Sequence, residues 1–289
     1  MRRLLAADRV RFGRRRDLWI LVALVPLVMA VLFVREFDTL TTPPSMEVVT
    51  DPYDPVAEAE IRAQMLANWR EQMTIELPAF AFPASLLKII GNLGPAALLA
   101  VYLAVALTAG EFEWGTVRTL HLTSSRGRTL ATRFLVIVGL VGIALLLALA
   151  LGAVLPFLMS VEGAPLQASA VATPDLLAQL LLRCAILLPF VAIPALLAVL
   201  TRSMSLAFLL TLLVFAADLA LASTPFWTTS PIPWLPAVTI SGSINRLLSP
   251  GSDIARLVPA SVSVVALLTW GLLPMLLAIA RFRRLDLNE

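Results

Sequence analysis

The chain has 289 residues, of which 59% are hydrophobic and 14% charged, and its formal net charge is +3. Soluble domains carry about one quarter charged residues, so this composition excludes an ordinary soluble domain. Apolar runs long enough to cross a bilayer recur along the chain, which predicts an all-α polytopic membrane protein. Cys184 is the only cysteine and lies in an apolar run, so an intrachain disulfide is excluded. One cysteine and one histidine also argue against a conventional zinc or haem site.

The lysine content excludes one class of nucleotide site. Lys88 is the only lysine, and Ile89 follows it. A P-loop needs the sequence Gly-Lys-Ser/Thr, in which the lysine reaches the terminal phosphates. The chain therefore has no such ATP or GTP site. The positive charge does not point to nucleic acid, and we expect no nucleic-acid partner, because in membrane proteins basic residues set the orientation in the bilayer.

Hydropathy predicts six transmembrane helices. They cover residues 18–34, 89–109, 134–159, 176–200, 206–222 and 257–280. Only "TRSMS" separates the fourth span from the fifth, which predicts a tight helical hairpin. We expect residues 1–17 to lie on the inner membrane surface as a basic amphipathic segment. The first span is retained rather than cleaved as a signal peptide, because "VREFD" follows it without a small-residue cleavage site.

The distribution of basic residues predicts the direction of the spans. With the N-terminus in the cytoplasm, the inner segments 1–17, 110–133, 201–205 and 281–289 hold 15 lysines and arginines, whereas the outer segments hold 6. Basic residues favour the cytoplasmic side. Both termini are then cytoplasmic. We expect one permease domain over residues 1–289, passing several times through the inner (plasma) membrane of a bacterium.

Two outer loops differ in kind. The large loop 35–85 contains an expected amphipathic helix over residues 56–73, with Ile61, Met65, Leu66 and Trp69 on one side. The second loop, 223–256, is rich in proline and serine. Part of it, residues 237–248, is expected either to re-enter the membrane or to form short helices at its surface.

The longest inner loop, residues 110–133, is polar, and its sequence is "GEFEWGTVRTLHLTSSRGRTLATR". Gly115 suits the left-handed residue that ends a helix, and Thr116 suits an N-cap. A short helix over residues 117–122 is therefore expected, and Ser125 can cap the third span. Such a helix lies across the membrane surface and can contact a cytoplasmic partner. The alternative is an ordinary loop whose charges only set the topology.

This loop resembles that of type-2 ABC exporter permeases. The matching residues are Glu111, Gly115, Thr116, Arg118, Ser125, Arg126 and Arg133. The resemblance implies that the short helix is a coupling helix, which docks in a groove of a separate P-loop ATPase. It also implies two ATPase copies, which bind ATP and Mg²⁺, and a second permease copy, identical or paralogous. This chain itself needs no cofactor. The expected ATPase-coupling residues are Glu111, Glu113, Gly115, Thr116, Val117, Arg118, Leu120, His121 and Arg126.

Two charges lie within expected spans, Arg183 and Asp218. Charges at this depth cost free energy and usually face partners or cavities. Counted from the turn between the fourth and fifth spans, their depths differ by roughly 7 Å, which a long arginine can bridge. We expect an interhelical ion pair, either as a structural clamp or as a polar gate or cargo contact.

The resulting expectation is an exporter permease and not an enzyme. Glu111 and Glu113 are two residues apart on a helix and point to different sides, so they converge poorly for acid–base chemistry. A membrane-embedded enzyme would have only His121 for a histidine-dependent site, and no Gly-x-Ser-x-Gly motif is present. The alternative is a secondary transporter or channel without an ATPase, which would need a recognisable ion pathway. The cargo and the direction of transport do not follow from the residues; export is implied by the resemblance.

Overall fold

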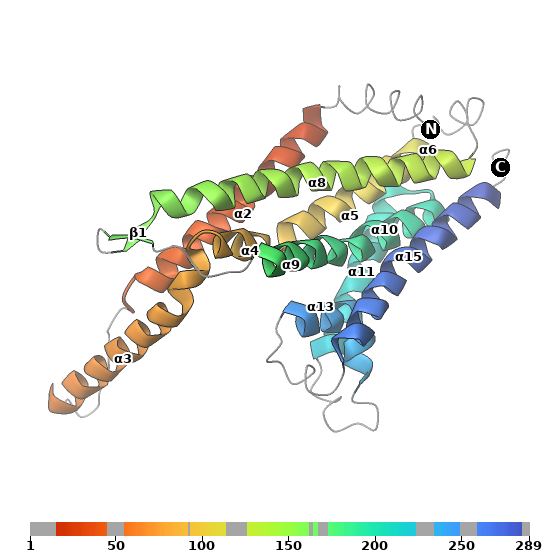
Figure 1. The fold of residues 1–289 in the computed structure, drawn as a ribbon. Coiled ribbons are helices and arrows are strands. Elements are labelled where there is room, and N and C mark those ends of the chain that lie inside the picture. Colours follow the sequence, from red (N-terminus) through yellow and green to blue (C-terminus); the bar gives the residue numbers. More distant parts are fainter. Residues whose placement is uncertain are drawn as a thin grey trace. The chain divides into compact units, whose positions relative to one another are not determined.

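The computed structural model describes residues 16–44, 55–91, 93–113, 126–161, 164–166, 173–223, 234–248 and 259–284. Nearly all of these residues lie in helices (Figure 1). The strands within these ranges are β1 (Ser160–Val161) and β2 (Ala164–Pro165), which form a minimal antiparallel hairpin. The predicted all-α class is therefore confirmed for the described part of the chain.

Five helical stretches in the described ranges are long and apolar enough to cross a membrane. They are α2 (Arg16–Thr41), α8 (Arg126–Leu158), the consecutive pair α9 (Thr173–Ile186) and α10 (Leu188–Thr201), α11 (Met204–Ser223), and α15 (Ala260–Arg284). These stretches overlap the expected first, third, fourth, fifth and sixth spans. They are compatible with a multi-pass membrane protein, as the composition predicts.

The second span differs from the expected continuous helix over residues 89–109. The structure has α4 (Ala84–Gly91), α5 (Gly94–Thr108) and the single turn α6 (Gly110–Glu113). The sequence "GNLGP" explains the first break, because Pro95 has no N–H to continue a helix from α4 but is tolerated in the first turn of a new one, α5. With 15 residues, α5 is about 22 Å long, shorter than the roughly 30 Å hydrocarbon core.

The sixth apolar stretch is a bent pair upstream of α5. Its first arm is α3 (Pro55–Glu76), extended by the 3₁₀ turn η1 (Leu77–Phe80), and its second arm is α4. The two arms meet at 97°. A helix is present over residues 56–73 as α3, but its expected amphipathic character is not: Ile61 and Met65, on the side expected to be apolar, are exposed.

Local breaks shape the α9–α10–α11 region. Pro189 stands in the first turn of α10, directly after the break at Leu187, as its missing N–H allows. At the other end of α10, Arg202 adopts a left-handed conformation with φ 57°, and its N–H donates to the Ala198 carbonyl. Such a residue closes a helix. The α10–α11 hairpin expected from "TRSMS" is therefore confirmed.

The described chain divides into two compact units. The first contains residues 16–22, 94–113, 126–143, 181–223, 234–248 and 259–284. In this unit α10 packs against α15, α5 and α11. Gly271 permits the close approach of α15, because a Cβ atom there would lie 2.8 Å from the Leu188 Cβ. Phe190 of α10 stacks on Phe215 of α11, with ring centroids 4.7 Å apart.

The second unit contains residues 23–44, 55–91, 93, 144–161, 164–166 and 173–180. Here α4 packs closely on α8. The Ser85 hydroxyl donates to the Gly152 carbonyl at 2.7 Å, and a Cβ atom at Gly152 would lie 2.8 Å from Cγ2 of Ile89. Phe80 packs against Phe33 and Phe37, with ring centroids 5.1 and 5.5 Å away.

The contact at Gly152 gives a first prediction. Gly152→Val should lower the free energy of unfolding by about 2 kcal/mol, because the added side chain overlaps Ile89 and pushes α4 from α8. Gly142→Val is the matched control on the same helix, since a Cβ atom there meets nothing within 4 Å. Unfolding by SDS in mixed micelles measures both variants. Equal stability of the two would show that α4 does not pack at Gly152.

Candidate functional site

The polar loop expected to carry the coupling helix is described only at its two ends. Residues 114–125 lie outside the described residues, and with them Gly115, Thr116, Val117, Arg118, Leu120 and His121. The side chains of Glu111 and Arg126 also lie outside them. The site is therefore built from α6, which enters the loop, and from α8, which leaves it.

The entering turn, α6, is attached to two other helices of the first unit. The backbone N–H of Met204, the first residue of α11, donates to Oε1 of Glu113 at 2.6 Å. The first N–H groups of a helix have no partner within the helix, and a carboxylate there also meets the positive end of the helix dipole. Phe112 packs edge-on against the buried Phe282 near the end of α15, with ring centroids 5.9 Å apart.

The leaving helix, α8, is attached to α5 through a buried arginine. Arg133 is 2% exposed, and its Nη1 donates to the Leu107 carbonyl at 3.0 Å. Because α5 ends at Thr108, its last carbonyl groups lack partners within the helix. A basic side chain is suited to that position by hydrogen bonding and by the helix dipole. Arg133, noted from sequence only as the basic opener of the third span, therefore caps the C-terminus of α5.

The first turn of α8 also lies beside the end of α15. A Cβ atom at Gly127 would overlap the guanidinium of Arg283. A small apolar cluster of Val105, Ala109, Ala198 and Ala207 joins α5, α10 and α11 nearby. We call this region, formed by α6, the start of α8, the α10–α11 turn and the last turn of α15, the α6 end of the first unit.

Segments that charge counting assigned to one side of the membrane thus meet in space. The described parts of 110–133, 201–205 and 281–289 all contribute to the α6 end. Arg128, Arg281, Arg283 and Arg284 are exposed there. The side of the membrane on which this end lies stays a prediction of the positive-inside rule.

Asp218 has partners other than the expected arginine. Its two carboxylate oxygens accept the backbone N–H groups of Ile240 and Ser241, at 2.8 and 2.7 Å. These residues begin α13 (Ile240–Leu248). The Thr239 hydroxyl accepts the next N–H, from Gly242, at 3.0 Å. The two side chains together satisfy the donors that a helix start leaves free.

In the structure Asp218 caps the start of α13 and does not form the expected ion pair with Arg183. The physical reason is that a helix start offers a carboxylate several aligned N–H donors and a positive dipole end. Arg183 lies half-buried in α9. The sequence does carry a cap signal here, because Thr239 directly precedes "ISG".

The described part of the loop 223–256 forms short helices, and whether they re-enter the membrane or lie at its surface stays a prediction. The 3₁₀ turn η2 (Leu235–Val238) and α13 lie against α15, as Figure 1 shows for α13. The Ala237 carbonyl accepts the hydroxyls of Ser243 and Ser263, and the Val238 carbonyl accepts Nε1 of Trp270 at 2.8 Å. The bonds from Ser263 and Trp270 fix η2 to α15.

The described residues contain no group of three or more histidine, cysteine, aspartate or glutamate side chains placed to hold a metal ion. Comparison with protein-family models, with curated proteins and with solved structures finds no match for this chain.

Proposed function

We propose that the chain is the permease subunit of an ATP-driven ABC exporter in a bacterial inner membrane. It would move its substrate outward with energy from ATP hydrolysis in a separate ATPase, and it would not hydrolyse ATP itself. The proposal includes cytoplasmic termini, two ATPase copies and a second permease copy. It rests on the resemblance of residues 110–133 to the coupling loop and on the lack of a P-loop in this chain.

One structural observation carries the proposal furthest: the loop is anchored to different helices at its two ends. Glu113 holds the entering turn to the start of α11, and Arg133 holds the leaving helix to the end of α5. A displacement of residues 114–125 by a partner would therefore be transmitted to α5, α8 and α11 together. An unanchored loop would absorb the same displacement locally.

The contacts of Asp218 argue against an ATPase-independent transporter or channel. That alternative needs an ion pathway through the spans, and Asp218 is one of the two intramembrane charges noted from sequence. Its carboxylate oxygens are already bound by two backbone N–H groups. A carboxylate used as a helix cap is a poor carrier of protons or cations, since each release would leave the helix start without partners.

The test is coupling to an ATPase. The chain is reconstituted in proteoliposomes with a candidate P-loop ATPase subunit from the same genome, and ATP hydrolysis is measured with and without the permease. Combined replacement of Glu111, Thr116 and Arg118 by alanine should reduce hydrolysis to the level of the ATPase alone. The matched control replaces Glu71, Thr74 and Arg70, the same residue types on the exposed face of α3.

The control variant should keep full stimulation and co-purification with the ATPase. If the loop variant also binds the ATPase and stimulates it fully, coupling through residues 110–133 is wrong. If the wild-type chain neither binds nor stimulates the ATPase, the ABC proposal itself fails.

A further inference from the structure

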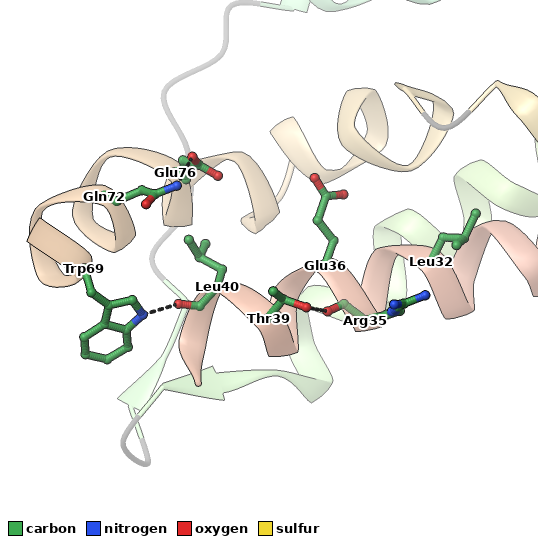
Figure 2. Close-up of a pocket in the computed structure, with 8 residues that line it drawn as sticks. All are labelled: Leu32, Arg35, Glu36, Thr39, Leu40, Trp69, Gln72 and Glu76. Carbon is green, nitrogen blue, oxygen red and sulfur yellow. Dashed lines mark hydrogen bonds between the residues drawn. The ribbon is translucent and has the colours of Figure 1, made fainter. Parts of the chain in front are cut away.

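A pocket of about 530 Å³ lies between α2 and α3 in the second unit (Figure 2). Leu32 and Leu40 of α2 supply its apolar lining, and Trp69 of α3 stands at one end. The indole Nε1 of Trp69 donates to the Leu40 carbonyl at 2.9 Å, which fixes the ring against α2. This hydrogen bond therefore holds one wall of the pocket in place.

The pocket lies just past the apolar run of α2. The apolar run 18–34 is about 25 Å long as a helix, close to the thickness of the hydrocarbon core, and Arg35 follows it directly. Leu24, Leu27, Val28 and Val31 are exposed on α2. Their helical spacing continues to Arg35, so one lipid-facing stripe runs along α2 to the pocket.

Hydrogen bonds within the protein already use several donors around the pocket. The Thr39 hydroxyl donates to the Arg35 carbonyl at 2.8 Å, and Nε2 of Gln72 donates to Oε1 of Glu76 at 3.1 Å. Oε1 of Gln72 and Oε2 of Glu76 remain as acceptors. The polar side of the pocket therefore offers hydrogen-bond acceptors together with one strong donor, the Arg35 guanidinium.

The pocket lining carries one arginine, Arg35, and two carboxylates, Glu36 and Glu76. Lys88 pairs with Glu36 at 2.5 Å, and its ammonium also lies 4.9 Å from the Phe80 ring centroid. The negative charge of Glu36 is therefore balanced by the positive charge of Lys88. No described residue accepts a hydrogen bond from the Arg35 guanidinium or pairs its charge with Glu76. One positive and one negative group remain for a ligand.

We propose that this pocket binds the headgroup of a phospholipid that carries a primary amine. The phosphate contacts Arg35, whose guanidinium matches phosphate oxygens. The ammonium donates to the carboxylate of Glu76 and to the amide oxygen of Gln72, and an acyl chain follows the stripe on α2. A choline headgroup has no N–H to donate and therefore cannot make these hydrogen bonds. A glycerol headgroup has no positive charge for Glu76. This inference is independent of the proposed transport function.

The experiment is a lipid competition on the purified full-length chain. Native mass spectrometry counts the lipids retained from micelles with equal amounts of phosphatidylethanolamine, phosphatidylcholine and phosphatidylglycerol of identical chains. Phosphatidylethanolamine should be retained in preference to both others. Arg35→Gln and Glu76→Gln should each reduce its retention roughly tenfold, as expected for loss of one charge-assisted hydrogen bond. Arg70→Gln and Glu71→Gln, matched changes on α3 outside the pocket, should leave retention unchanged.

Both pocket residues are exposed, so their substitution should not unfold the chain, and circular dichroism checks this. Arg35→Lys provides a second test, because it keeps the charge and should keep most of the retention.

The proposal is overturned if phosphatidylcholine is retained equally or if Glu76→Gln has no effect. Preferential retention of phosphatidylglycerol would indicate a simple anion site instead. A change of oligomeric state in Arg35→Gln or Glu76→Gln, without lipid loss, would assign the pocket to a second copy of the chain. Displacement of the lipid by millimolar phosphoethanolamine would assign it to a soluble ligand.

Discussion

Replacement of Arg133 by alanine is expected to lower the free energy of unfolding by about 4 kcal/mol. Arg133 is among the largest fully buried side chains of the described chain, and its guanidinium caps the Leu107 carbonyl. Alanine would leave both a cavity and a buried carbonyl without its donor. The measurement is SDS-induced unfolding in mixed micelles.

Two further substitutions separate these contributions. Arg133→Met keeps most of the volume but removes the donor, and it also removes the cost of burying a charge, so we expect a smaller loss of about 2 kcal/mol. Arg128→Ala is the control, because Arg128 is exposed on the same helix and its loss should change stability by less than about 0.5 kcal/mol. A methionine variant as unstable as the alanine variant would show that the cap, and not the cavity, accounts for the effect.

Arg133 also links stability to the proposed coupling. It holds the end of α5 directly before the turn α6 that carries Glu113. Loss of the cap should therefore speed hydrogen exchange at the end of α5 more than in α10, which lacks this contact. Uniformly faster exchange would instead indicate a general loss of stability.

The apolar helices could be predicted from sequence because a membrane span needs a long run of apolar residues, whichever tertiary contacts it makes. Five of the six expected spans coincide with long apolar helices. The second does not, because hydropathy averages over residues and ignores a local backbone restriction. "GNLGP" is apolar enough to pass in a hydropathy window, although Pro95 interrupts the helix. A search for helix breakers within each span would have found this boundary.

The hydrogen-bond partners of the site were not predictable in the same way. Glu113 bonds to Met204, 91 residues later, and Asp218 bonds to Ile240, 22 residues later. Both contacts satisfy backbone groups, which every residue has, so no side-chain pattern marks the partner in the sequence. Complementary charge predicts Arg183 as the partner of Asp218, whereas the backbone N–H groups that bind Asp218 leave no such mark in the sequence.

The pocket beside Trp69 shows a further limit. The sequence predicted α3 as an amphipathic helix and placed Arg35 at the end of the first span. It did not bring Arg35 and Glu76 to one pocket, because the relative position of α2 and α3 depends on packing around Phe80. Residues that are separate in sequence and of ordinary type become a candidate site only through that packing.

Replacement of Asp218 by alanine is expected to cost about 3 kcal/mol, since it removes two charge-assisted hydrogen bonds from the start of α13. Asp218→Asn keeps one acceptor oxygen and should lose about half as much. Asp38→Ala is the control, because Asp38 is exposed near the end of α2, where a carboxylate gains nothing from the helix dipole. SDS titration gives the stabilities, and hydrogen exchange of residues 240–248 reports whether the loss is local to α13.

A charge exchange distinguishes the helix cap from an ion pair with Arg183. In the double variant Arg183→Asp with Asp218→Arg, an ion pair would be re-formed with reversed charges, and stability should recover relative to each single variant. A cap cannot be restored in this way, because an arginine at 218 has no acceptor for the N–H groups of Ile240 and Ser241 and brings positive charge to the positive end of α13. We therefore expect no recovery, with exchange in residues 240–248 as fast as in Asp218→Ala. Recovery of both stability and slow exchange would show that Arg183, and not α13, is the principal partner of Asp218.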